Sequence, residues 1–72
     1  MTFGERIVVL RKARKITQEE LAEKIGVSRN MLCKYENDLA EPRLITFICL
    51  ASVLDVSLDY LARGENWRKS DE

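Results

Sequence analysis

The segment 17–36 predicts two short helices joined by a very tight turn. Thr17 and Glu20 match a capping box, in which a threonine hydroxyl and a glutamate carboxylate satisfy free backbone amides at a helix start. Gly26 lies where this helix must end in a left-handed conformation that a Cβ atom would penalise. Ser28 can cap a second helix immediately afterwards. Few arrangements other than two packed helices crossing at a steep angle fit so short a turn.

This unit is a helix-turn-helix, the arrangement that presents a second helix to the DNA major groove. The second helix, residues 29–36, is called the recognition helix below. A helical wheel divides it into two faces. Its inner face consists of Leu32, Tyr35 and the stem of Glu36. Its outer face centres on Asn30 and Lys34, with Arg29 and Cys33 at the margins.

The outer face carries side chains suited to reading base edges. Arg29 and Asn30 are the best specificity candidates, because an arginine can donate to guanine, an asparagine can pair with adenine, and the first residues of this helix lie nearest the bases. Gln18 can meet the DNA backbone where free helix amides attract a phosphate, and Asn37 and Arg43 can contact the backbone from the following loop. The alternative is that such side chains are merely solvated. The predicted DNA-binding residues are Thr17, Gln18, Ser28, Arg29, Asn30, Lys34, Asn37 and Arg43.

The rest of the chain predicts three more helices and no strand. A capping box at Thr2 and Glu5 starts a helix over about residues 3–15, with Phe3, Ile7, Leu10 and Arg14 at helical spacing. A loop follows the recognition helix, marked by Asn37, Asp38, Glu41 and Pro42, and its proline prevents the helix from continuing. A fourth helix has a core face of Leu44, Phe47, Leu50, Ala51 and Leu54. A short fifth helix carries the cap Ser57, the apolar residues Leu58 and Leu61, and the stop Gly64.

Length and composition restrict the function further. With 72 residues, the sequence predicts one small domain over residues 1–64 and a polar tail over residues 65–72. There is no histidine, and Cys33 and Cys49 do not form a CxxC pair, so we expect no metal, no cofactor and no catalysis. We also expect no signal peptide and no membrane span, and therefore a cytoplasmic protein.

The charge balance supports two hypotheses. Net charge is zero, but residues 1–43 carry nine Lys and Arg against seven Asp and Glu, whereas residues 44–72 carry three against five. This asymmetry favours a phosphate partner for the first part of the chain. The zero total instead favours a protein-interaction module that keeps the helical fold and binds DNA weakly. The polar row on the recognition helix favours DNA binding over the interaction module.

The chain resembles the Cro/CI, or XRE-type, family of phage-repressor-like DNA-binding domains over about residues 3–62. The resemblance rests on Leu10-Arg11, the run from Thr17 to Ala22, Gly26-Val27-Ser28, Tyr35-Glu36, Pro42 and the run from Val56 to Leu61. It implies an all-α, five-helix, lambda-repressor-like domain of prokaryotic or phage origin. It further implies a transcriptional regulator, a repressor acting as a homodimer on a roughly palindromic operator.

The same resemblance implies roles for particular residues. Base contacts are expected at the positions of Gln18, Arg29, Asn30 and Lys34. A pairing of Arg11 with Glu36 is also implied, joining the first helix to the end of the recognition helix. Loss of one partner would leave the other charge poorly compensated, at about 3 to 5 kcal/mol if the pair is buried. We assign this pair to structure.

The chain departs from the family pattern on two helix faces. Val8 and Val9 look outward on the first helix, and Ile45 and Cys49 lie opposite the core face of the fourth helix. Scattered apolar surface residues are normal. The alternative hypothesis is a second hydrophobic face for self-association or for a protein partner. Its candidate residues are Ile45, Ile48, Cys49 and Trp67.

Overall fold

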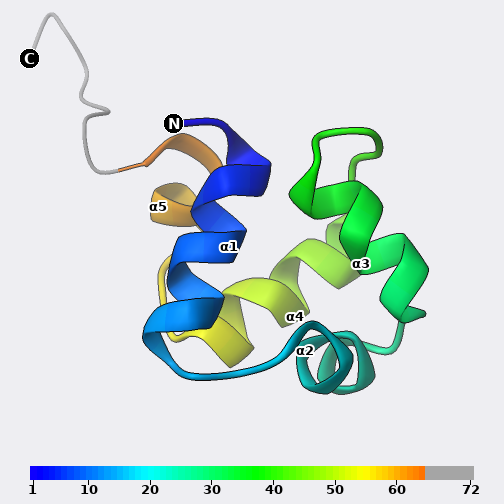
Figure 1. Ribbon diagram of the computed structural model, residues 1–72. Helices are drawn as coiled ribbons and strands as arrows, with labels where there is room; N and C mark the ends of the chain where they lie inside the picture. Colours follow the sequence, from blue (N-terminus) through cyan, green and yellow to red (C-terminus); the bar gives the residue numbers. More distant parts are fainter. Residues whose placement is uncertain (65–72) are drawn as a thin grey trace, which may run out of the picture.

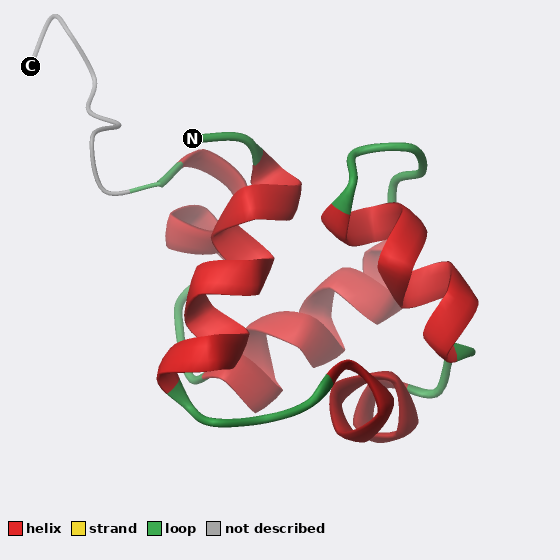
Figure 2. Cartoon of the chain, viewed as in Figure 1, coloured by secondary structure: helices red, strands yellow, loops and turns green. Residues whose placement is uncertain are grey.

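A computed structural model describes residues 1–64, which form five α-helices joined by short loops, with no strand in that range. Figure 1 shows the order of the helices along the chain, and Figure 2 distinguishes the helices from the loops that join them. The helices are α1 (Phe3–Ala13), α2 (Gln18–Ile25), α3 (Arg29–Glu36), α4 (Leu44–Leu54) and α5 (Leu58–Arg63). The expected all-α, five-helix class is confirmed.

The first helix is shorter than expected. It ends at Ala13 rather than at Lys15, because Lys15 adopts a left-handed conformation with φ of 59°. Arg14 is the C-cap, and its side chain is exposed instead of continuing the core stripe of α1. The guanidinium of Arg14 leans across to α4, where Nε donates to the carbonyl oxygen of Leu54 at 2.9 Å. The sequence expectation for the end of this helix was therefore wrong.

The turn between α2 and α3 is built from the local signals that the sequence carries. Thr17 Oγ1 accepts from the amide of Glu20 at 3.0 Å, and the amide of Thr17 donates to the carboxylate of Glu20 at 2.9 Å. Gly26 ends α2 in the left-handed region, with φ of 76°. Ser28 then caps α3 by accepting from the amide of Met31 at 3.0 Å. Local signals thus set both ends of α2 and the start of α3.

All five helices contribute to one core. Its fully buried side chains come from α1, α2, α3, α4 and α5 in turn: Ile7, Leu21, Leu32, Leu50, Leu54 and Leu61. In Figure 1, α4 passes behind α1 and α3, and α2 lies beside the end at which α3 begins. Because α3 places only one face against this core, its other face is left to solvent.

One core assignment from the sequence was wrong. Leu44 is 73% exposed, although it shares a helical stripe with Phe47 and Leu50. It is the first residue of α4, so it lies beyond the edge of the core, whereas Phe47 lies one turn further in and packs against the core cluster. The buried side of the first turn of α4 is instead occupied by Thr46.

Candidate nucleic-acid interface

The recognition helix α3 is buried on one side and polar on the other. Leu32, Tyr35 and Glu36 are buried, as the wheel predicts. Arg29, Asn30 and Lys34 are exposed. Within residues 1–64 the side chains of these last three form no hydrogen bond or ion pair. The helix therefore presents two unpaired cationic donors, Arg29 and Lys34, and the unpaired amide of Asn30 to a ligand.

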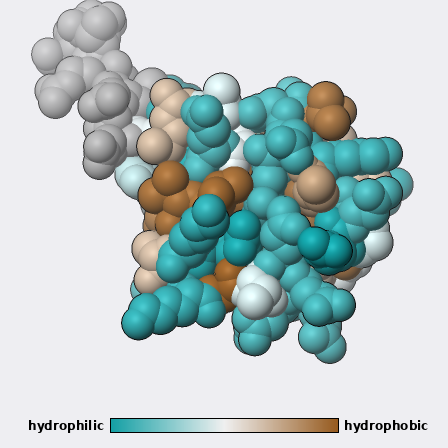
Figure 3. Space-filling model, in the orientation of Figure 1, coloured by the Kyte–Doolittle hydropathy of each residue, from teal (hydrophilic) through white to brown (hydrophobic). Residues whose placement is uncertain are grey.

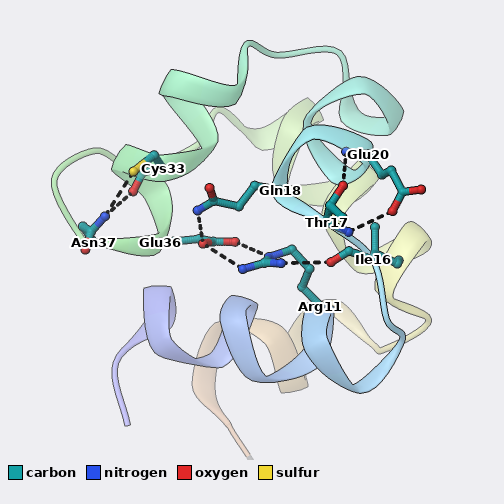
Figure 4. Close-up of polar contacts among 8 residues, drawn as sticks. All are labelled: Arg11, Ile16, Thr17, Gln18, Glu20, Cys33, Glu36 and Asn37. Carbon is teal, nitrogen blue, oxygen red and sulfur yellow. Dashed lines mark hydrogen bonds and ion pairs between the residues drawn. The ribbon is translucent and has the colours of Figure 1, made fainter.

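Glu36 is the centre of a polar network beneath this helix (Figure 4). Arg11 Nε donates to Glu36 Oε2 at 2.8 Å, and the two side chains are only 11% and 4% exposed. Arg11 Nη1 also donates to the carbonyl oxygen of Ile16 at 2.9 Å, in the loop before α2. Gln18 Nε2 donates to Glu36 Oε1 at 2.7 Å. The Arg11–Glu36 pair that the family resemblance implies is present, and it is largely shielded from water.

A second set of contacts holds the end of α3 against α1. The amide of Gly4 donates to Asp38 Oδ1 at 2.9 Å. The hydroxyl of Thr2 and this Gly4 amide lower the pKa of the Asp38 carboxyl from its usual 3.8. A Cβ atom at Gly4 would come within 2.7 Å of the carbonyl oxygen of Tyr35. The first turn of α1 thus abuts the last turn of α3, which fixes the direction in which α3 points.

The helix-turn-helix geometry agrees with the comparison to known proteins. Residues 9–61 match a family model described as helix-turn-helix. The chain is an XRE-type helix-turn-helix domain. The membership of this family that the sequence motifs predict is confirmed.

Several curated relatives of this helix-turn-helix domain are transcription regulators. The chain is 42% identical to the uncharacterized HTH-type transcriptional regulator YqaE of Bacillus subtilis, over 93% of this chain and 58% of that protein. It is 38% identical to the immunity repressor protein of Bacillus phage phi105, over 100% of this chain and 50% of the repressor. The chain therefore spans about half the length of the curated relatives it matches.

Two solved structures of DNA complexes match the domain over nearly their whole length. The P22 c2 repressor in complex with a synthetic operator superposes with a TM-score of 0.87 and 35% identity, covering 90% of this chain and 98% of that one. SinR, the master regulator for biofilm formation, in complex with DNA, superposes with a TM-score of 0.77 and 36% identity, covering 83% of this chain and 97% of that one. The lambda-repressor-like fold expected from the sequence is thus the observed one.

Three of the predicted DNA-binding residues of the domain also stabilise helix ends. The hydroxyls of Thr17 and Ser28 accept from backbone amides, so each keeps its proton for another acceptor. Asn37 Nδ2 donates to the carbonyl oxygen and to Sγ of Cys33, at 2.8 and 3.4 Å. Arg43, in contrast, is the exposed N-cap of α4 and makes no side-chain cap hydrogen bond.

The predicted self-association residues Ile45 and Ile48 lie on α4, not on the recognition helix α3. The right-hand side of Figure 1 holds α2 and α3, and the same side of Figure 3 is mainly hydrophilic, whereas hydrophobic groups gather over α1. Ile45 and Ile48 lie on α4 and are 65% and 41% exposed. Cys49 is half-buried and packs against the core, so the expectation that it faces outward was wrong. Trp67 lies outside the described residues.

Sequence reasoning missed Arg6, a buried charge in the domain. Its side chain spans from α1 to the end of α5, where Nε donates to the carbonyl oxygen of Leu61 at 2.9 Å and Nη2 to that of Ala62 at 3.1 Å. These carbonyls are among the unpaired acceptors that every helix C-terminus leaves. The sequence contains a pattern that indicates this burial: Arg6 lies three residues after Phe3, on the side of the helix that also carries the core residue Ile7.

Residues 1–64 contain neither a cluster of metal-ligating side chains nor a membrane-spanning helix. No group of three or more His, Cys, Asp or Glu side chains in this range lies close enough to hold a metal ion. None of the five helices is long and apolar enough to cross a membrane.

Proposed function

We propose that this domain is a sequence-specific, double-stranded DNA-binding transcriptional regulator that inserts α3 into the major groove. The observation that carries the proposal is the row of Arg29, Asn30 and Lys34, exposed and unpaired on the side of α3 opposite the core. The similarity to the P22 c2 repressor with its operator and to SinR with DNA supports it.

In this proposal the first turn of α3 reads base edges, and the residues around it contact the DNA backbone. Arg29 and Asn30 lie in the first turn and read base edges, where each good bidentate pair contributes about 1 to 3 kcal/mol of discrimination. Lys34 lies one turn further along the same face. Thr17, Gln18 and Ser28 meet the DNA backbone from the helix starts, and Asn37 and Arg43 meet it from the loop before α4. Arg11 and Glu36 have a structural task beneath them.

We further propose that the protein is a repressor that acts as a homodimer on a roughly palindromic operator in the cytoplasm of a prokaryotic cell. A single recognition helix reads only a few base pairs, so a second copy about one helical turn away, roughly 34 Å, extends the site. The outer face of α4, with Ile45 and Ile48, is the surface that we assign to this self-association. The alternative occupant of this face is another protein.

Selection of binding sites from random duplexes tests the proposed function, followed by a salt titration on the selected site. We expect an enriched sequence with two symmetric half-sites, because two copies bind through a two-fold axis. The logarithm of the binding constant should fall linearly with the logarithm of salt concentration, with a slope of about −0.9 for each phosphate neutralised. An unenriched pool, or binding that does not respond to salt, would contradict the proposal.

A further inference from the structure

The carboxylate of Glu36 connects the start of α2 with the end of α3. Its two oxygens are divided between two partners: Oε2 accepts from Arg11 Nε at 2.8 Å, and Oε1 accepts from Gln18 Nε2 at 2.7 Å. Arg11 Nη2 also reaches Oε1, at 3.5 Å. Since the Glu36 side chain is only 4% exposed, water does not compete freely for either oxygen.

This arrangement determines which end of the Gln18 amide faces the protein. An ionised carboxylate only accepts hydrogen bonds, so the nitrogen of Gln18 must face Glu36 and the oxygen must point away from it, as Figure 4 shows. The nitrogen keeps one N–H that Glu36 does not use. The Gln18 side chain is thus held in one orientation before any ligand arrives.

We infer that Glu36 is a positioning residue for the DNA contact of Gln18, in addition to its ion pair with Arg11. The inference rests on the proposed function. By fixing the direction of the amide, Glu36 determines which donor and acceptor Gln18 offers to the DNA beside α2. Arg11 completes the device, because its positive charge offsets a carboxylate that would otherwise lie unpaired near phosphates.

The variant Glu36→Gln keeps the size and shape of the side chain but removes its ability to hold Gln18 in one orientation. Glutamine has the same length but only one acceptor oxygen, so it cannot satisfy Arg11 and Gln18 with separate oxygens. Its NH2 group would then face one of these donors, and Gln18 can answer only by turning its own oxygen inward. This turn would reverse the donor and the acceptor that Gln18 offers to DNA.

The test is a double-mutant cycle on the operator obtained by selection, using Glu36→Gln, Gln18→Ala and the double variant, each verified as folded by circular dichroism at the assay temperature. We expect Glu36→Gln to weaken operator binding about tenfold in the wild-type background and less than about twofold in the Gln18→Ala background. Equal weakening in both backgrounds would overturn the inference. A wild-type chain that binds no duplex would instead contradict the proposed function, before any variant is compared.

Asp38→Asn is the matched control, since it also converts a carboxylate to an amide near the end of α3 but leaves Gln18 untouched. Removing a negative charge near DNA favours binding, so charge alone predicts equal or tighter binding for both variants. Weakening by Glu36→Gln together with unchanged or tighter binding by Asp38→Asn supports positioning. Similar weakening by both variants would overturn it.

A measurement on the wild-type protein makes the test independent of whether Glu36→Gln folds. The side-chain amide signals of Gln18 in nuclear magnetic resonance spectra report whether one N–H is hydrogen-bonded. We expect one of the two protons to show a hydrogen-bonded shift and slow exchange with solvent, both in the free protein and with operator bound. Loss of that signature on DNA binding would overturn the inference, because the contact with Glu36 would then be broken when Gln18 meets DNA.

Discussion

Gly4 in α1 lies so close to the end of α3 that a Cβ atom built on it would approach the carbonyl oxygen of Tyr35 to 2.7 Å. The carbonyl is part of the main chain and a Cβ is bonded directly to it, so neither can turn aside as the end of a flexible side chain would. The substitution Gly4→Ala should therefore lower the free energy of unfolding by about 1 to 3 kcal/mol, the usual effect of overpacking. Urea denaturation measures this change.

The direction of the Gly4→Ala effect is informative in itself. In an ordinary helix position the same substitution would stabilise the protein by roughly 0.5 to 1 kcal/mol, because alanine is the better helix former. A more stable Gly4→Ala variant would show that the two helices can separate without loss. It would remove this contact from the account of how α3 is held.

Arg6 provides a prediction about a buried charge. Its guanidinium donates to two carbonyl oxygens at the end of α5, those of Leu61 and Ala62. Arg6→Met leaves these acceptors unsatisfied, and we expect a loss of about 2 to 4 kcal/mol of stability, as for buried hydrogen bonds to a charged group. Arg6→Lys keeps the charge but cannot donate to both oxygens in the same geometry. We therefore expect Arg6→Lys to unfold at a lower temperature than the wild type. An unchanged unfolding temperature would contradict a stabilising role for the two hydrogen bonds of Arg6.

Asp38 links stability to pH. The Thr2 hydroxyl and the Gly4 amide lower its pKa below the usual 3.8 in the folded chain, so folding favours the ionised form. The resulting stability is fully present above about pH 3.8 and is lost as the pH falls through the lower folded value. Asp38→Asn retains an acceptor for the Gly4 amide and tolerates the left-handed backbone at this position, but it does not titrate.

Thermal unfolding of wild type and Asp38→Asn across this range tests the linkage. The wild type should be the more stable of the two at neutral pH, and the difference should shrink as the pH falls below about 3.8. A difference that stays constant with pH would show that the Asp38 charge contributes nothing to folding.

The outer face of α4 gives a prediction about assembly. If Ile45 lies in a self-association surface, Ile45→Glu should shift the sedimentation coefficient from that of a dimer toward that of a monomer. Leu39→Glu is the control, because Leu39 is also exposed, at 75%, but lies in the loop before α4. Unchanged sedimentation of Ile45→Glu beside a dimeric wild type would show that the interface lies elsewhere.

The parts of this fold that sequence reasoning could predict are those that local chemistry determines. Thr17 and Gly26 set the two ends of α2, and Ser28 sets the start of α3, through bonds within three or four residues, and the recognition helix was predicted with its observed bounds. The inner face of α3 follows from the helical period alone. The DNA-contact roles of the outer face stay predictions.

Contacts between residues far apart in the chain were not predictable in the same way. The bond between Gln18 and Glu36, the approach of Gly4 to Tyr35 and the reach of Arg6 to α5 depend on how the helices pack, which the period of one helix does not contain. The ion pair of Arg11 with Glu36 was expected only because the family resemblance implied it. The error at Leu44 has the same origin, since a helical stripe does not show where the core ends.

The most direct test of the central claim compares Arg29→Ala with Arg43→Ala. Affinities of both variants for the selected operator and for random duplex DNA are measured at one fixed salt concentration. Arg29→Ala should weaken the free energy of binding by about 1 to 3 kcal/mol on the operator and by much less on random DNA, because it removes a base contact. Arg43→Ala should weaken both duplexes alike, because it removes a phosphate contact. An equal loss on operator and random DNA for Arg29→Ala would contradict direct reading of bases by α3.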